Sequence, residues 1–129
     1  MRTIVFVLLG VTAVGAGAGA GCSSAKSGAT GPSGSPAATI TITSTGVSPA
    51  HVTVPRGSQV QFTNNDRISH QVSSDPHPEH TDCPEINSVG FLTTNQSRQT
   101  SNLNIARTCG FHDHNRPDDK SLQGSIVIQ

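Results

Sequence analysis

Short segments in which apolar and polar residues alternate run through the chain from residue 39 onwards. The clearest are Thr39 to Thr43, Val52 to Val54 and Val60 to Phe62, and turn-forming residues such as Pro55-Arg56-Gly57 separate them. Period-two alternation places apolar side chains on one face of a strand, and closely spaced short strands are typical of β-sandwiches and barrels. No segment has helical periodicity. We therefore predict an all-β domain with almost no helix.

Five later segments are also expected to contribute strands. They lie at 68–72, 89–91, 103–105, 109–111 and 125–128. Ser73 to Asn87 contains three prolines and four acidic residues, which indicates a long loop. Three of the chain's six histidines lie in or beside this loop, at positions 70, 77 and 80.

The N-terminal segment has the pattern of a targeting signal followed by a flexible tether. A short positive head and an apolar run lead through small residues to Gly21 and then Cys22. This order predicts a lipoprotein-type signal peptide over residues 1–21, with Cys22 lipidated and anchored to the membrane. Residues 22–38 are rich in Ser, Gly, Ala and Pro and are expected to form a flexible tether. Residues 39–129 then form the single folded domain.

The composition argues against nucleic acid as a partner. The formal net charge is +0, charged residues make up 12% of the chain, and Trp and Tyr are absent. A basic surface and aromatic stacking platforms are therefore both missing.

Four stretches, taken in order, resemble the cupredoxin family. Gly46–Val54 is similar to the family's x-F-x-P-x-x-I-x-V stretch, and Gly57–Asp66 is similar to its G-x-x-V-x-F-x-N-x-D stretch. Ser69–Val72 lies where the family has its first copper-binding histidine, and Leu122–Ile128 is similar to the closing M-x-G-x-I-x-V stretch. The resemblance spans nearly all of residues 39–129. It implies a Greek-key antiparallel β-sandwich with a copper site at one end, and it puts His70 in the place of the first copper-binding histidine.

The resemblance allows two registers for the remaining ligands. In the first, Cys109-Gly110-Phe111-His112 matches the family's C-x-x-H, so that His70, Cys109 and His112 bind copper. Leu122 then stands in the place of the axial Met and cannot coordinate. In the second, Phe111-His112-Asp113-His114 resembles the Y-H-x-H stretch of multicopper oxidases, and Asp113 holds the place of the copper Cys. His112 and His114 would then share one strand face.

The Pro-rich loop adds His77 and His80 at the same end of the sandwich. The sequence thus predicts a metal site centred on His70, His112 and His114, with His77 and His80 as further ligands and Cys109 as a ligand only if reduced. His51 begins an ordinary strand and is expected at the surface.

The sequence is compatible with two states of Cys83 and Cys109: a disulfide bond between them, or a free Cys109 thiolate that binds metal. If Cys22 is lipidated, these two thiols remain, and thiols outside the cytoplasm usually pair. A disulfide would tie the histidine loop to the 109–114 strand, contribute about 3 kcal/mol and exclude a blue-copper thiolate. The sequence alone does not decide between a Cys83–Cys109 disulfide and Cys109 as a metal ligand.

These features predict an extracytoplasmic copper-binding protein that transfers electrons or stores and delivers copper. Its expected partners are the membrane, through Cys22, and a redox or copper-delivery protein. A metal-free envelope module and a small copper oxidase-like enzyme are the alternatives. No paired acid and base is evident, which favours a protein that is not an enzyme.

Overall fold

The computed structural model describes residues 34–129. The predicted signal peptide, the lipidation of Cys22 and most of the predicted tether lie outside this range. Among the described residues, no helix is long and apolar enough to cross a membrane.

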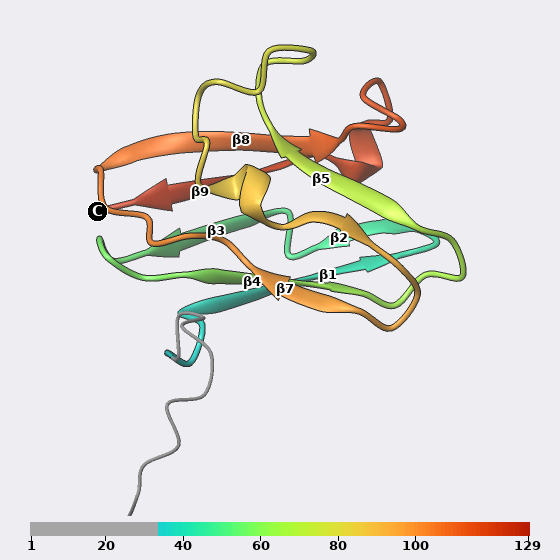
Figure 1. Cartoon of the computed structure of the whole chain (residues 1–129), viewed down its shortest axis with the longest axis horizontal. Helices are drawn as coiled ribbons and strands as arrows, with labels where there is room; N and C mark the ends of the chain where they lie inside the picture. The colour runs from blue at the N-terminus through green and yellow to red at the C-terminus, as the bar shows by residue number, and fades with distance from the viewer. Residues whose placement is uncertain (1–33) are drawn as a thin grey trace, which may run out of the picture.

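Two sheets stack face to face (Figure 1). The four-stranded sheet has the order β2-β1-β4-β7, formed by β2 (Gly46–Ser48), β1 (Ala38–Thr43), β4 (Val60–Asn64) and β7 (Ser97–Gln99). The five-stranded sheet has the order β3-β9-β8-β5-β6, formed by β3 (His51–Val54), β9 (Gly124–Ile128), β8 (Arg107–Asp113), β5 (His70–Ser74) and β6 (Gly90–Leu92). Two short 3₁₀ helices, η1 (Ile86–Ser88) and η2 (Lys120–Leu122), are the helical elements of the described range.

The predicted all-β sandwich is confirmed, but its strands are not all antiparallel. β1 pairs with β4 in parallel, and β3 pairs with β9 in parallel, while the other named pairs are antiparallel. Both sheets are therefore mixed. The alternation of side chains has a period of two in either direction, so the sequence pattern carries no information about strand direction.

Apolar side chains from both sheets fill the space between them. Ile40 and Phe62 come from the four-stranded sheet, and Phe111 and Ile126 come from the five-stranded sheet. The rings of Phe62 and Phe111 meet edge to face across the sandwich, with centroids 5.1 Å apart. This core fixes which face of β8 points inward.

Two expected strands differ from the structure. Residues 103–105 form no strand; Leu103 makes one isolated bridge to Ser58, and Ile105 is exposed. The edge position of that sheet is taken instead by β7, whose Ser-Arg-Gln sequence has no apolar member to reveal it. Val89 is buried beside β6 while Phe91 is exposed, so these two residues do not share a face.

Candidate metal centre

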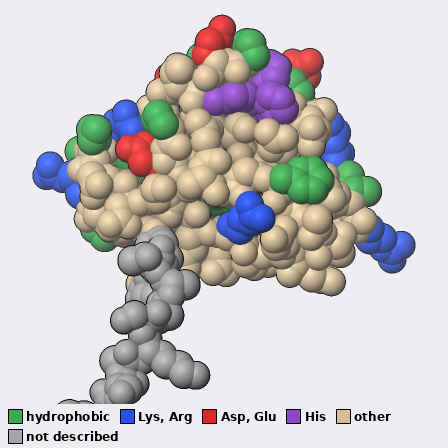
Figure 2. Space-filling model, in the orientation of Figure 1, with side chains coloured by type: hydrophobic (Ala, Val, Ile, Leu, Met, Phe, Trp, Pro, Cys, Tyr) green, Lys and Arg blue, Asp and Glu red, His purple; other side chains and the backbone are tan. Residues whose placement is uncertain are grey.

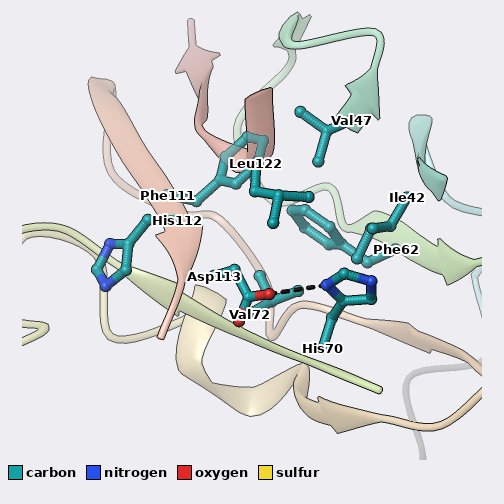
Figure 3. Close-up of a pocket in the computed structure, with 9 residues that line it drawn as sticks. All are labelled: Ile42, Val47, Phe62, His70, Val72, Phe111, His112, Asp113 and Leu122. Carbon is teal, nitrogen blue, oxygen red and sulfur yellow. Dashed lines mark hydrogen bonds and ion pairs between the residues drawn. The ribbon is translucent and has the colours of Figure 1, made fainter. Parts of the chain in front are cut away.

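Strand β8 carries different chemistry on its two faces. Cys109, Phe111 and Asp113 point into the sandwich, whereas His112 points outward, and Figure 3 shows His112 on the opposite side of the ribbon from Asp113. His114 follows the strand, and its backbone N–H donates to the carbonyl of Gln71 at 2.7 Å. The period of two in β8 thus separates the inner polar residue from the outer imidazoles.

The loop after β5 crosses the outer face of β8. The N–H of Asp75 donates to the carbonyl of Gly110 at 3.1 Å, and Asp82 closes the loop by donating to the carbonyl of Asp75 at 2.9 Å. Figure 1 shows this segment arching above β8. The loop thereby lays His77 and His80 over His112.

Four histidines meet at this place: His77, His80, His112 and His114. One ring nitrogen from each lies within 4.8 Å of the others, and the six ring pairs include five with centroids between 4.9 and 5.5 Å apart. We call these four residues the histidine cluster. Figure 2 shows histidine side chains as one patch with acidic side chains beside it.

His80 and His112 each have one ring nitrogen that is hydrogen-bonded to an oxygen of the histidine loop or of β5. Nδ1 of His112 donates to Oδ1 of Asp75 at 2.6 Å, and Nδ1 of His80 donates to the carbonyl of Ser74 at 2.8 Å. The second nitrogen, Nε2, differs between the two rings: that of His112 has no hydrogen-bond partner among the described residues, whereas that of His80 contacts Nδ1 of His114. A carboxylate or carbonyl behind the imidazole is the usual arrangement around a metal-ligating histidine, since it fixes the tautomer and the ring orientation.

Nε2 of His112 is the atom that most clearly fits a metal. The residue is 2% exposed, and this nitrogen is buried with no hydrogen-bond partner among the described residues. A buried polar atom without a partner is costly, so it calls for a ligand. Nε2 of His80 lies 2.8 Å from Nδ1 of His114, which shows how closely the donor atoms approach one another.

Gly110 makes room for this arrangement. A Cβ atom at position 110 would overlap the carboxylate of Asp75. A side chain there would push Asp75 away from His112, so a glycine at this point of β8 allows the close approach.

Cys83 and Cys109 form a disulfide, as one of the two sequence hypotheses expected. Their Cα atoms are 5.7 Å apart and both residues are fully buried. The bond ties the histidine loop to β8, three residues after His80 and three before His112. Because the sulfur of Cys109 is used in this bond and faces the core, Cys109 is not a metal ligand, and the first register is wrong.

The structure does not bring His70 to the histidine cluster. His70 starts β5, is fully buried inside the sandwich, and its Nδ1 lies 2.7 Å from Oδ2 of Asp113 while its Nε2 lies 3.1 Å from Oδ2 of Asp66. The expected ligand set must be corrected, because β5 presents residue 70 to the inner face, whereas His112 lies on the outer face.

The inner place that the cupredoxin resemblance assigns to copper does not fit a metal. His70, Asp113 and Leu122 line one small pocket there (Figure 3). Both nitrogens of His70 already have carboxylate partners, and Leu122 offers no donor atom. Asp113, which the second register puts in the place of the copper Cys, faces His70, and His112 and His114 flank it in the sequence.

Asp66 is held as an anion in this inner network. The backbone N–H of Arg67 donates to Asp66 at 2.6 Å and lowers the pKa of the Asp66 carboxyl. Partial burial opposes this shift, and the contact with His70 adds to it. The network therefore has a structural role in the core.

Sequence reasoning missed the parts played by Asp75 and Gly110. The position of Asp75, two residues before His77, could have indicated a carboxylate close to the imidazoles of the loop. Its partner, however, is His112, 37 residues away. His51 is exposed and contacts Ser125 rather than the cluster, with Nδ1 2.8 Å from Oγ.

Two stacked mixed sheets with these connections define the cupredoxin fold, and solved structures support that assignment. Purple cupredoxin from Nitrosopumilus maritimus is 16% identical and has a TM-score of 0.54, with 71% of this chain and 99% of that chain covered. Oxidised plastocyanin from Dryopteris crassirhizoma is 15% identical with a TM-score of 0.54, covering 70% and 99%. Amicyanin from Paracoccus versutus is 16% identical with a TM-score of 0.56, covering 72% and 81%.

The similarity is one of fold. No protein-family model matches the chain, and no curated protein does.

Proposed function

We propose that the histidine cluster binds copper and that the protein stores or delivers copper in the cell envelope. The observation that carries this proposal is the buried Nε2 of His112, which has no partner among the described residues and is turned by Asp75 toward three other imidazoles. Such a preorganised, nitrogen-only set suits a transition-metal ion.

Copper is favoured over other metals by the ligand chemistry. Imidazole nitrogen suits copper and zinc, and among divalent first-row ions Cu²⁺ binds most strongly to a given nitrogen site. The fold points the same way: a similar amicyanin structure was solved with Cu(I). Copper bound here would be held by His77, His80, His112 and His114, of which His112 is buried and His77 is exposed.

Storage or delivery is favoured over electron transfer by the absence of sulfur donors. A blue-copper centre needs a Cys thiolate and usually a weak axial Met. Cys83 and Cys109 are joined to each other, and the only Met in the sequence is Met1. Electron transfer is the second candidate, supported by the cupredoxin fold itself.

The envelope location rests on three features. Residues 1–21 have the order of a secretory signal, Cys22 stands in the place of a lipidated cysteine, and the disulfide requires an oxidising compartment. A lipidated Cys22 and a tether that ends before β1 would hold the domain close to the membrane.

The test is copper retention with its spectrum. After dialysis, the protein should keep copper, give an electron paramagnetic resonance (EPR) signal with nitrogen hyperfine coupling, and lack an intense thiolate band. Replacing His112 and His114 together by Ala should abolish retention, and His51→Ala should leave it unchanged. Equal copper in the double variant and the wild type would show that the cluster is not the site.

A further inference from the structure

The four imidazoles of the histidine cluster are not held equally. His112 is fixed by Asp75, and His80 is fixed by the carbonyl of Ser74. The backbone of His114 is fixed by its N–H contact with the carbonyl of Gln71, and Nδ1 of its ring lies 2.8 Å from Nε2 of His80. The ring of His77 makes no hydrogen bond within residues 34–129, although its centroid lies 5.1 to 5.5 Å from the three others.

Exposure follows the same division. His112 is buried, His80 and His114 are half-buried, and His77 is exposed. His77 is thus the most solvent-accessible ring of the cluster, and His112 is the least accessible. A group from solvent can reach the ring of His77 without displacing a hydrogen bond of that ring within the described residues.

We propose that His77 is the exchangeable ligand through which the metal enters and leaves, while His80, His112 and His114 form the permanent binding face. This inference rests on the proposed copper function. A free side chain loses little when it releases a metal, because no second hydrogen bond breaks and the ring turns into water. Releasing His112 would instead leave a buried nitrogen unpaired.

Transfer by this route is a ligand substitution without electron transfer. The bond between the metal and a His77 nitrogen breaks, and a nitrogen or oxygen donor of the acceptor forms the new bond at the same position. The acceptor is a metal-binding protein or chelator that reaches the exposed side of the cluster. The other three imidazoles are then displaced one after another.

Transfer kinetics provide the first test. The full chain, purified in detergent and loaded with Cu²⁺, is mixed with EDTA, and copper loss is followed in stopped flow. His77→Ala should keep stoichiometric copper and transfer it faster than the wild type, with a smaller loss of affinity than His112→Ala or His114→Ala. His51→Ala is the matched control and should transfer at the wild-type rate.

Exogenous imidazole provides the second test. The position vacated in His77→Ala is open to solvent, so added imidazole should restore the wild-type EPR spectrum and slow transfer. The position vacated in His112→Ala is buried and should not be filled. His114→Ala serves as a second comparison if His112→Ala does not fold.

The outcomes separate this inference from the function on which it rests. If the wild type retains no copper, the proposed function fails and the inference with it. If the wild type retains copper but His77→Ala loses as much affinity as His112→Ala or His114→Ala, or transfers at the wild-type rate, His77 is an ordinary ligand and the inference alone is wrong. Rescue of His112→Ala by imidazole would also overturn it.

Discussion

Nδ1 of His70 lies 2.7 Å from Oδ2 of Asp113, inside the sandwich at the place where the cupredoxin resemblance puts copper. The neighbouring residue His112 points to the opposite face of β8 and joins the histidine cluster. A hydrogen-bonded pair therefore fills the inner place, and the candidate metal centre lies on the outer face of the same strand.

Removing His70 should affect stability and leave copper binding intact. In His70→Ala the carboxylates of Asp66 and Asp113 lose a buried partner, so we expect the free energy of unfolding to fall by about 1–3 kcal/mol. Denaturant unfolding measures the loss of stability. The copper content of the folded variant at low temperature shows whether the metal site is intact. Loss of copper from a folded His70→Ala protein would return His70 to the ligand set.

Asp75→Asn should weaken copper binding without breaking the fold. The amide keeps the size of the side chain but replaces the charged hydrogen bond to Nδ1 of His112 by a weaker neutral one, so the affinity should fall by about 10- to 100-fold. Competition with a chromophoric chelator gives the affinity. Glu79→Gln is the matched control, because Glu79 is exposed in the same loop and makes no hydrogen bond within the described residues. Equal losses in both variants would contradict an orienting role.

The disulfide should stabilise the domain and leave no free thiol at Cys83 or Cys109. Replacing both cysteines by Ser opens a loop with a sequence separation of 26 residues. In the chain-entropy account, such a loop corresponds to about 3 kcal/mol. Thiol titration of the denatured, unreduced protein and denaturant unfolding check both statements. A reactive thiol at either position, or unchanged stability in the double variant, would count against the bond.

The Asp66 carboxylate should make the domain less stable in acid. Its pKa is lowered from 3.8 in the folded state, chiefly by the Arg67 N–H. Its contribution to stability is therefore complete above pH 3.8 and is lost as the pH falls below that value toward the folded pKa.

Asp66→Asn should accordingly be less stable than the wild type at neutral pH, and the gap should narrow in strong acid. Unfolding curves at several pH values measure the gap. Asp118→Asn is the control, because Asp118 is exposed and makes no hydrogen bond in residues 34–129. A gap between wild type and Asp66→Asn that does not change with pH would rule out this linkage.

Cys22→Ala should release the protein from the membrane or block its processing. The motivation is the apolar run, the small residues and the cysteine that follows them. Cell fractionation and intact-mass measurement check it. A variant that fractionates with the membrane at the mass of the wild-type protein would exclude lipidation at Cys22.

The sequence by itself determined the class of fold and singled out the histidines of the loop and of the 112–114 segment, but it also included His70 and Cys109 and left out Asp75. Alternating residues in β1 and β4 predicted strands with one buried face, because burial imposes a period of two. The same period placed His112 and Asp113 on opposite faces of β8. The histidines of the loop and of the 112–114 segment were recognised as candidates because imidazole is a metal ligand in any fold.

Only the tertiary structure decided which histidines meet. Alternation says that residue 70 and residue 112 each lie on one face of a strand, but which face is inward depends on packing against the other sheet, where Phe62 meets Phe111. That packing turned His70 inward to Asp113 and His112 outward to the loop. The Asp75–His112 contact and the Cys83–Cys109 bond join residues far apart in sequence, and such pairings arise from strand order, which local pattern does not contain.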